Sequence, residues 1–250
     1  MQIDKRKIKY IFRALICKSI IINLPSSIVE LRTLTLNMKN QIKVDIVSDV
    51  VCPWCYIGKR RLELAIAQLE NEIDFKVDYI PFELNPGSEN SNQHLFDYLA
   101  EKYGSADHVE QMSNKVEAVA HDLGIEMNFK NINFTANTLM AHQLLEFVTN
   151  SQEKSKLKEA LLKAYFTHNI HVGIKDNLIK IAKEAQISDE IIAQFNNTNN
   201  TKQVEERQNS IKKAGINSVP SFIINDQFLI QGAQETEVFI KAFTDISKEK

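Results

Sequence analysis

The sequence predicts an α/β protein in which a strand–helix–strand unit and a strand–strand–helix unit flank a long helical block. Residues 42–46 and 73–80 alternate between apolar and polar side chains, which is the period of a strand, and an amphipathic run lies between them. This order indicates two parallel strands joined by a right-handed crossover helix. Two further apolar runs, residues 220–224 and 227–230, precede a last amphipathic run and complete the predicted fold.

The crossover helix and the C-terminal hairpin have clear local signals. After Pro53, apolar residues recur at helical spacing at Leu62, Ala65, Ile66 and Leu69. The last two strands are separated by the two residues 225 and 226, Asn-Asp, a length typical of a hairpin turn. The closing helix is predicted from one apolar face, which consists of Val238, Phe239, Ala242, Phe243 and Ile246.

The block between these units, residues 93–213, is helical in character almost throughout. Gly104 and Gly124 end the first two helical patterns. Thr135, Asp176 and Ser188 are expected N-caps, because their short side chains can accept hydrogen bonds from free amides of a first helical turn. The predicted helices are 93–103, 106–123, 135–149, 153–168, 176–186 and 188–196.

Composition limits the classes of function. The 250 residues, 44% of them hydrophobic, can form one sizeable core with a subdomain, and a net charge of -2 favours neither nucleic acid nor an anionic membrane as partner. Three cysteines are too few for a disulfide-scaffolded secreted domain. We expect a first domain of residues 38–90 and 206–250, with residues 91–205 as a helical insertion.

Residues 1–37 stand apart from this pattern. Four basic residues precede an apolar run at 10–24, which suggests a signal peptide, but Arg13 and Lys18 interrupt the run and no small-residue cleavage site follows. The run is also short for a membrane span. We expect a poorly ordered extension, with targeting or anchoring as the alternative, and Met38 as a possible start of translation.

The pair Cys52 and Cys55 carries the predicted chemistry, because it lies between the first strand and the first helix. A cysteine at a helix N-terminus meets free amides and the positive end of the helix dipole, which favour the thiolate. Pro53 suits the first turn of that helix. We expect Cys52 to be the exposed attacking thiol and Cys55 the shielded thiol that resolves the mixed disulfide. Trp54 is expected to be exposed and to pack against an apolar protein substrate.

A zinc site is the structural alternative for a Cys-x-x-Cys pair. Structural zinc needs four ligands, and the sequence has neither a second such pair nor two histidines at the required spacing. His168 and His171 fall one residue short. We therefore predict no metal and no cofactor.

A second element is Val219-Pro220, which opens the third strand. A proline at a strand edge is its ordinary interpretation. In a redox site the same bond is expected to be cis and to face Cys52, with the Val219 main chain free to pair with an extended substrate.

Four further positions have weaker signals. Asp45 could lie beneath the cysteines as a proton acceptor for Cys55, or on a solvated face. Asp49 is expected to be a turn or capping residue, and His142 a hydrogen-bonded packing residue rather than part of the cleft. The lysines on the helix at 153–168 are expected to form a solvated face, and they are Lys154, Lys156, Lys158 and Lys163.

These motifs together resemble the DsbA family of thioredoxin-like oxidoreductases, in its FrnE-type branch, over residues 40–247. The residues that carry the resemblance are 48–58, with Cys-Pro-Trp-Cys; 82–86, Phe-Glu-Leu-Asn-Pro; 137–142, with Asn-Thr and Ala-His; 215–222, with Val-Pro; and 232–234, Gly-Ala-Gln. The resemblance implies a thioredoxin-like fold and a protein dithiol–disulfide oxidoreductase. Cys52 would be its nucleophile and Pro220 its cis-proline. The expected substrate-binding residues are Pro53, Trp54, Val219 and Pro220.

One departure from the family bears on the redox potential. Secreted DsbA proteins typically carry histidine between the cysteines, whereas Trp54 has no charge. We therefore predict a reduction potential between about -120 mV, the value of a strongly oxidising DsbA protein, and about -270 mV, the value of thioredoxin.

Other functions remain open at the level of sequence. Kappa glutathione transferases and 2-hydroxychromene-2-carboxylate isomerases resemble this architecture, but they use serine in place of the first cysteine. A redox-sensing binding module is a further alternative. The expected partners are protein thiols and disulfides, with glutathione as a candidate, and no nucleic acid or membrane. If residues 1–37 are not a signal, the expected location is the cytoplasm, which suits reduction or isomerisation.

Overall fold

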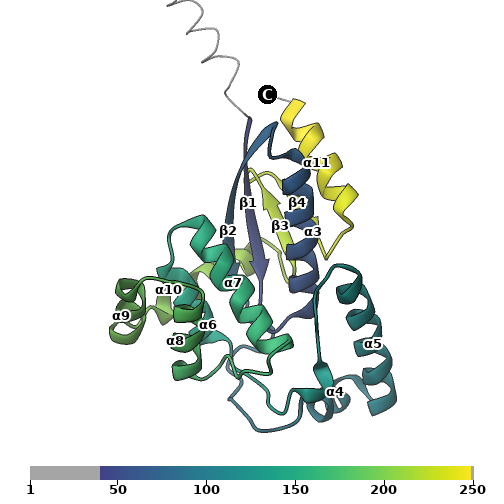
Figure 1. Ribbon diagram of the computed structural model, residues 1–250, viewed down its shortest axis with the longest axis vertical. Coiled ribbons are helices and arrows are strands. Elements are labelled where there is room, and N and C mark those ends of the chain that lie inside the picture. Colours follow the sequence, from purple (N-terminus) through teal and green to yellow (C-terminus); the bar gives the residue numbers. More distant parts are fainter. Residues whose placement is uncertain (1–39, 249–250) are drawn as a thin grey trace, which may run out of the picture. The chain divides into compact units, whose positions relative to one another are not determined.

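The sheet consists of four strands in the order β2-β1-β3-β4. The computed structural model describes residues 40–248 (Figure 1). Strand β1 (Asn40–Ser48) pairs in parallel with β2 (Ile73–Pro81) and antiparallel with β3 (Ser221–Ile224), which pairs antiparallel with β4 (Phe228–Gln231). The predicted parallel pair and the C-terminal hairpin are confirmed. Asn225 and Asp226 both adopt positive φ, the conformation that a tight two-residue hairpin turn requires.

Helices α3 (Pro53–Leu69) and α11 (Thr236–Lys248) lie side by side on one face of the sheet (Figure 1). Alternate residues of β1 point toward them, so that Ile42, Val44 and Ile46 are buried against both helices. The opposite face has a smaller core around Val47, which also contains Ile211 of α10 (Thr201–Lys213). Successive side chains of β1 therefore point to opposite faces of the sheet, and helices cover both faces.

The largest core lies in the helical block, around residues such as Leu144, Leu157 and Phe166. Its helix α7 (Ser151–Phe166) packs on β2, so the block is attached to the sheet. The other helices of the block are α4 (Leu95–Tyr103), α5 (Ala106–Asp122), α6 (Leu139–Phe147), α8 (Lys175–Glu184) and α9 (Asp189–Asn197). The fold is thus the predicted thioredoxin-like arrangement with a helical insertion.

Several predicted boundaries were wrong. Helix α6 begins after Thr138, because Thr135 pairs with Ser91 in an isolated bridge and is no N-cap. Asp176 lies in the first turn of α8, while Ser188 caps α9 as predicted. The last of the predicted helices ends at residue 196, so α10 was not among them. The sequence of α10 is strongly polar, and only a narrow stripe of its residues is buried. The apolar periodicity from which a helix is predicted is therefore weak in α10.

The predictions for residues 1–37 lie outside the described residues, as does Cys17. The proposed division at residues 90 and 206 stays a prediction. Within residues 40–248, none of the helices has the length and apolar character needed to cross a membrane.

Candidate active site

Cys52 is the N-cap of α3, and Pro53 is the first residue of the helix. The Cys52 carbonyl accepts hydrogen bonds from the amides of Cys55, at 3.0 Å, and Tyr56, at 3.3 Å. The Cys52 side chain accepts no capping hydrogen bond. Both thiols are free, so the structure represents the dithiol form. The strand-to-helix junction therefore places the first cysteine where the sequence predicted it.

The two cysteines are more enclosed than the sequence suggested. Cys52 is 4% exposed and Cys55 is 1% exposed, whereas Cys52 was expected to be an exposed thiol. Cys52 is covered because it lies in the wall of a cavity rather than on a convex surface. Trp54, in contrast, is 41% exposed, as predicted.

The Val219-Pro220 peptide bond is cis, as predicted, and lies beside the first cysteine. The Val219 carbonyl oxygen is 4.0 Å from the Cys52 Sγ atom. A Cβ atom at Gly58 would come within 3.0 Å of the Pro220 side chain. Glycine at this position thus allows α3 to lie directly against the proline, which keeps the two motifs together.

Asp49 is completely buried and joins three segments of the chain behind the cysteines. Its Oδ1 atom accepts hydrogen bonds from the Val50 amide at 2.7 Å and from His142 Nε2 at 3.2 Å, and Oδ2 accepts one from the Leu84 amide at 2.8 Å. Burial favours a higher pKa, but the hydrogen bond and charge of His142 and the Leu84 amide hold the pKa of Asp49 below its usual value. Asp49 therefore ties the motifs at 82–86 and 137–142 to the segment that carries the two cysteines.

The thiol of Cys55 is held in its protonated form. Burial raises its pKa well above the usual value, and the neighbouring Cys52 raises it further, while the positive charge of Lys158 acts in the opposite direction. A buried thiol of high pKa beside a thiol in a cavity wall fits an attacking and a resolving pair.

Two of the four lysines expected on a solvated face are buried, which corrects that prediction. Lys156 and Lys163 are exposed, whereas Lys154 and Lys158 face the protein interior. The Lys154 ammonium donates to Asp78 of β2 at 2.7 Å. Spacing could have indicated this, since residues 154, 158, 161 and 165 share one face of α7 and the last two are apolar.

Asp45 and His142 also have defined places. Asp45 is 6% exposed, so it does not lie on a solvated face. It forms an ion pair with Lys43 at 2.7 Å, so its carboxylate is directed along the strand rather than to Cys55. Both interpretations of Asp45 were therefore wrong. His142 is buried and hydrogen-bonded, as predicted.

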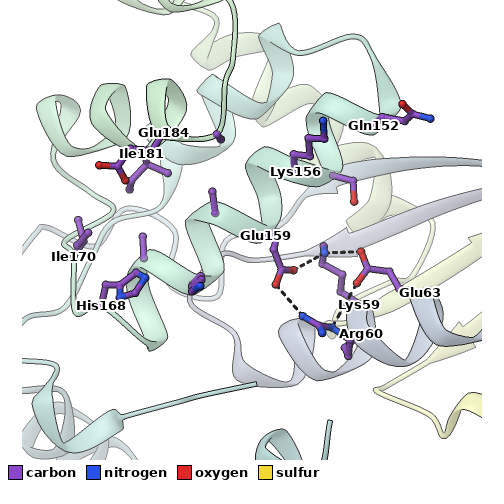
Figure 2. A pocket seen from close by; sticks show the side chains of 15 residues that line it. Lys59, Arg60, Glu63, Gln152, Lys156, Glu159, His168, Ile170, Ile181 and Glu184 are labelled. Atoms are coloured by element: carbon purple, nitrogen blue, oxygen red, sulfur yellow. Dashed lines mark hydrogen bonds and ion pairs between the residues drawn. The ribbon is translucent and has the colours of Figure 1, made fainter. Parts of the chain in front are cut away.

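A cluster of charged groups joins α3 to α7, as Figure 2 shows. Glu159 of α7 accepts hydrogen bonds from Lys59 at 2.6 Å, from Arg60 at 3.0 Å and from the Tyr56 hydroxyl at 2.8 Å. Lys59, Arg60 and Glu159 border a cavity of about 880 Å³. The cluster fixes the first turns of α3, and hence Cys55, relative to the insertion.

A second cavity, of about 330 Å³, lies beside Cys52. Trp54 of α3, Tyr98 of α4, Met112 of α5 and Val219 are among the residues that line it. The walls are mainly apolar, with Lys102 as a charged exception. The insertion thus contributes one side of a cleft whose other side carries the first cysteine.

Comparisons with known proteins agree with this geometry. The family model of the DSBA-like thioredoxin domain matches residues 43–244. YwbO, an uncharacterized protein of Bacillus subtilis (strain 168), is 29% identical over 214 residues, which cover 84% of this chain and 99% of that protein. The crystal structure of the probable DsbA oxidoreductase SCO1869 from Streptomyces coelicolor has a TM-score of 0.74 and 26% identity, and covers 84% of this chain and 91% of that one.

A more distant structure has the same fold. It is that of the cytosolic disulfide reductase DsbM from Pseudomonas aeruginosa with GSH, at a TM-score of 0.55 and 11% identity over 83% of this chain and 100% of that one. The range matched by the family model contains both cysteines and Pro220.

Proposed function

The chain belongs to the DSBA-like thioredoxin domain family, and from this membership we propose that it is a protein thiol–disulfide oxidoreductase that acts through Cys52 and Cys55. The observation that carries the proposal is the position of Cys52 at the N-cap of α3, with the Val219 carbonyl 4.0 Å from its sulfur. Motifs at 48–58, 82–86 and 137–142 support the finer assignment to the FrnE-type branch.

In the proposed reaction, the Cys52 thiolate attacks one sulfur of a substrate disulfide. A bond forms between Cys52 and that sulfur, and the other substrate sulfur leaves as a thiolate and takes a proton from solvent. Cys55 then attacks the Cys52 sulfur, the second substrate sulfur leaves as a thiolate, and the proton that Cys55 gives up passes through solvent to that thiolate. The substrate gains two electrons and the protein retains a Cys52–Cys55 disulfide. The raised pKa of Cys55 supports this order, because it leaves Cys52 as the first attacker.

Protein disulfides are the proposed substrate class. Pro53 and the exposed Trp54 ring would contact an apolar segment at the rim of the cleft, and the cleft of about 330 Å³ has mainly apolar walls. The Val219 main chain, held beside Pro220, would pair with an extended stretch of the substrate.

Glutathione is proposed as a second partner, which would reduce the pair after each turnover. The solved structure of DsbM with GSH supports this by analogy of fold. A reducing partner suits a role in the cytoplasm, where disulfides are transient, and we propose reduction or isomerisation there.

A glutathione-dependent transferase or isomerase, of the kappa or 2-hydroxychromene-2-carboxylate type, is the second candidate. The specific observation in its favour is the size and apolar character of the cleft, which suits a small apolar substrate. The presence of Cys55 favours the oxidoreductase. A transferase that activates glutathione does not need a resolving thiol, whereas Cys55, which is 1% exposed, provides one next to Cys52.

The variant Cys55→Ser tests the proposed function. Without the resolving thiol, the mixed disulfide is not resolved within the protein. We therefore expect reduced Cys55→Ser, mixed with insulin whose disulfides are intact, to accumulate a covalent adduct between Cys52 and an insulin cysteine, whereas the wild type does not. Mass spectrometry under non-reducing conditions measures the adduct.

The same assay has a contrary outcome. If Cys55→Ser forms no adduct and Cys55→Ala still conjugates glutathione to an electrophile at the wild-type rate, the transferase-like function replaces the oxidoreductase.

A further inference from the structure

Three lysines are buried within the described chain, and one of them donates no hydrogen bond to a described residue. Lys59 donates to Glu63 at 2.7 Å and to Glu159 at 2.6 Å, and Lys154 donates to Asp78 at 2.7 Å. Lys158 is 1% exposed, yet its ammonium has no hydrogen-bond partner among the described atoms. A buried ammonium ion without an acceptor is costly, so its retention on α7 calls for an anion.

The charges around Lys158 identify where that anion must come from. The ammonium lies 5.8 Å from the centre of the Tyr79 ring. The groups that interact electrostatically with it are Cys55, Asp49 and Cys52, which favour its charged form, and Lys59, which opposes it. Burial is the largest influence and lowers the pKa of Lys158 to about 8. Lys158 is therefore still mainly protonated near neutral pH.

Asp49 is not the direct partner, because the Lys158 ammonium has no hydrogen-bond partner among the described residues. Its Oδ1 atom already accepts from the Val50 amide and from His142, and its Oδ2 atom accepts from the Leu84 amide. Of the groups that favour the charged form of Lys158, the other two are the sulfurs of Cys52 and Cys55.

We propose that Lys158 is the buried counter-charge of the dithiol, stabilising the thiolate in the reduced form and losing this partner when the disulfide forms. Stabilising the reduced form makes the disulfide a stronger oxidant. Lys158 thus supplies a positive charge near the cysteines, whereas Trp54, between them, supplies none. It touches neither sulfur and acts through its charge. The inference rests on the proposed function, since it concerns the same pair.

The equilibrium with glutathione measures this effect. Cys52 thiolate and Cys55 thiol give two electrons to one oxidised glutathione, so that its S–S bond breaks and the Cys52–Cys55 bond forms. Two reduced glutathiones leave, one with the proton of Cys55 and one with a proton from solvent. The constant for this oxidation is obtained from the fraction of free thiols in glutathione buffers of known composition.

The variant Lys158→Met removes the charge and keeps the length of an unbranched side chain. We expect its oxidation constant to rise at least about tenfold, which is a potential lower by about 30 mV for each factor of ten. We also expect the rate of Cys52 alkylation at about pH 6 to fall by at least about tenfold, because less thiolate is present. Lys158→Arg should restore both values to within about threefold. Lys156→Met, an exposed neighbour on the same helix, is the matched control and should change neither value.

A second measurement uses the unchanged protein. Because the coupling of two charges is reciprocal, the pKa of Lys158 should be higher in the dithiol form than in the disulfide form. NMR titration of isotope-labelled lysine in both forms tests this. The inference would be overturned if the pKa of Lys158 were equal in the two forms. It would also be overturned if a folded Lys158→Met variant had the wild-type oxidation constant. Neither result would overturn the proposed function. Failure of the wild type to form the Cys52–Cys55 disulfide would overturn the proposed function, and this inference with it.

Discussion

Replacing Cys52 with serine is expected to slow the reduction of insulin disulfides by a factor on the order of 10³ or more. The hydroxyl of serine is a much weaker nucleophile than a thiolate, and the loss of a covalent nucleophile removes the whole pathway rather than one contribution to it. The fold should be unaffected, because the Cys52 side chain makes no capping hydrogen bond in α3. The measurement is the turbidity assay of insulin reduction with dithiothreitol.

Two controls make this result specific. Cys17→Ser changes the third cysteine of the chain and should retain the wild-type rate. Cys52→Ser also carries the residue that the transferase-like enzymes use, so glutathione conjugation by this variant at or above the wild-type rate would support the second candidate. An insulin-reduction rate for Cys52→Ser within about twofold of the wild type would contradict the proposed role of Cys52.

Asp49→Ala is expected to lower the free energy of unfolding by about 3 to 5 kcal/mol. Removing the carboxylate leaves the Val50 and Leu84 amides and His142 without their acceptor in a completely buried site. Asp49→Asn keeps one acceptor oxygen, and its loss should be smaller, about 1 to 3 kcal/mol. Urea unfolding followed by circular dichroism measures both values.

The matched control is Asp122→Ala, because Asp122 has an exposed side chain at the end of α5. Its stability should lie within about 0.5 kcal/mol of the wild type. If Asp49→Ala unfolds at the same urea concentration as this control, Asp49 does not join the three segments energetically.

The lowered pKa of Asp49 also fixes the sign of a pH effect. Because the folded pKa lies below the unfolded value of 3.8, the stabilisation by this carboxylate is fully present above the unfolded value. It is lost as the pH falls through the folded pKa. Asp49→Asn should therefore lose less stability than the wild type over that acidic range.

The parts of the fold that could be predicted from the sequence are those whose signal is local. The alternation in β1 and β2 and the two-residue turn at Asn225 each depend on neighbouring residues alone. The position of Cys52 at a helix N-cap was predictable for the same reason, since a strand pattern ends just before it and Pro53 follows. Even the cis bond at Pro220 was predicted, from its place before a strand and from the family resemblance.

The features that escaped prediction depend on contacts between distant segments. The sequence around Asp49 indicates only a polar residue in a turn. Asp49 joins buried segments because Leu84 and His142, which are distant in sequence, contact its carboxylate. Lys158 has the sequence neighbourhood of a solvated helix, with three other lysines near it. Helical spacing places it on the same face of α7 as Leu161 and Tyr165, but that this face is the buried one follows from the packing of α7 on β2. The enclosure of Cys52 has the same origin, because helices of the insertion form the other wall of its cavity.

The most direct test of the redox claim is a titration of the two thiols against buffers of known potential. Mass spectrometry after alkylation counts the free thiols at Cys52 and Cys55 separately. We expect both to disappear together in a single two-electron transition, at a potential between about -120 mV and about -270 mV. The proposed redox function would be contradicted if the thiols of Cys52 and Cys55 stayed free across this range. It would also be contradicted if they disappeared independently of each other.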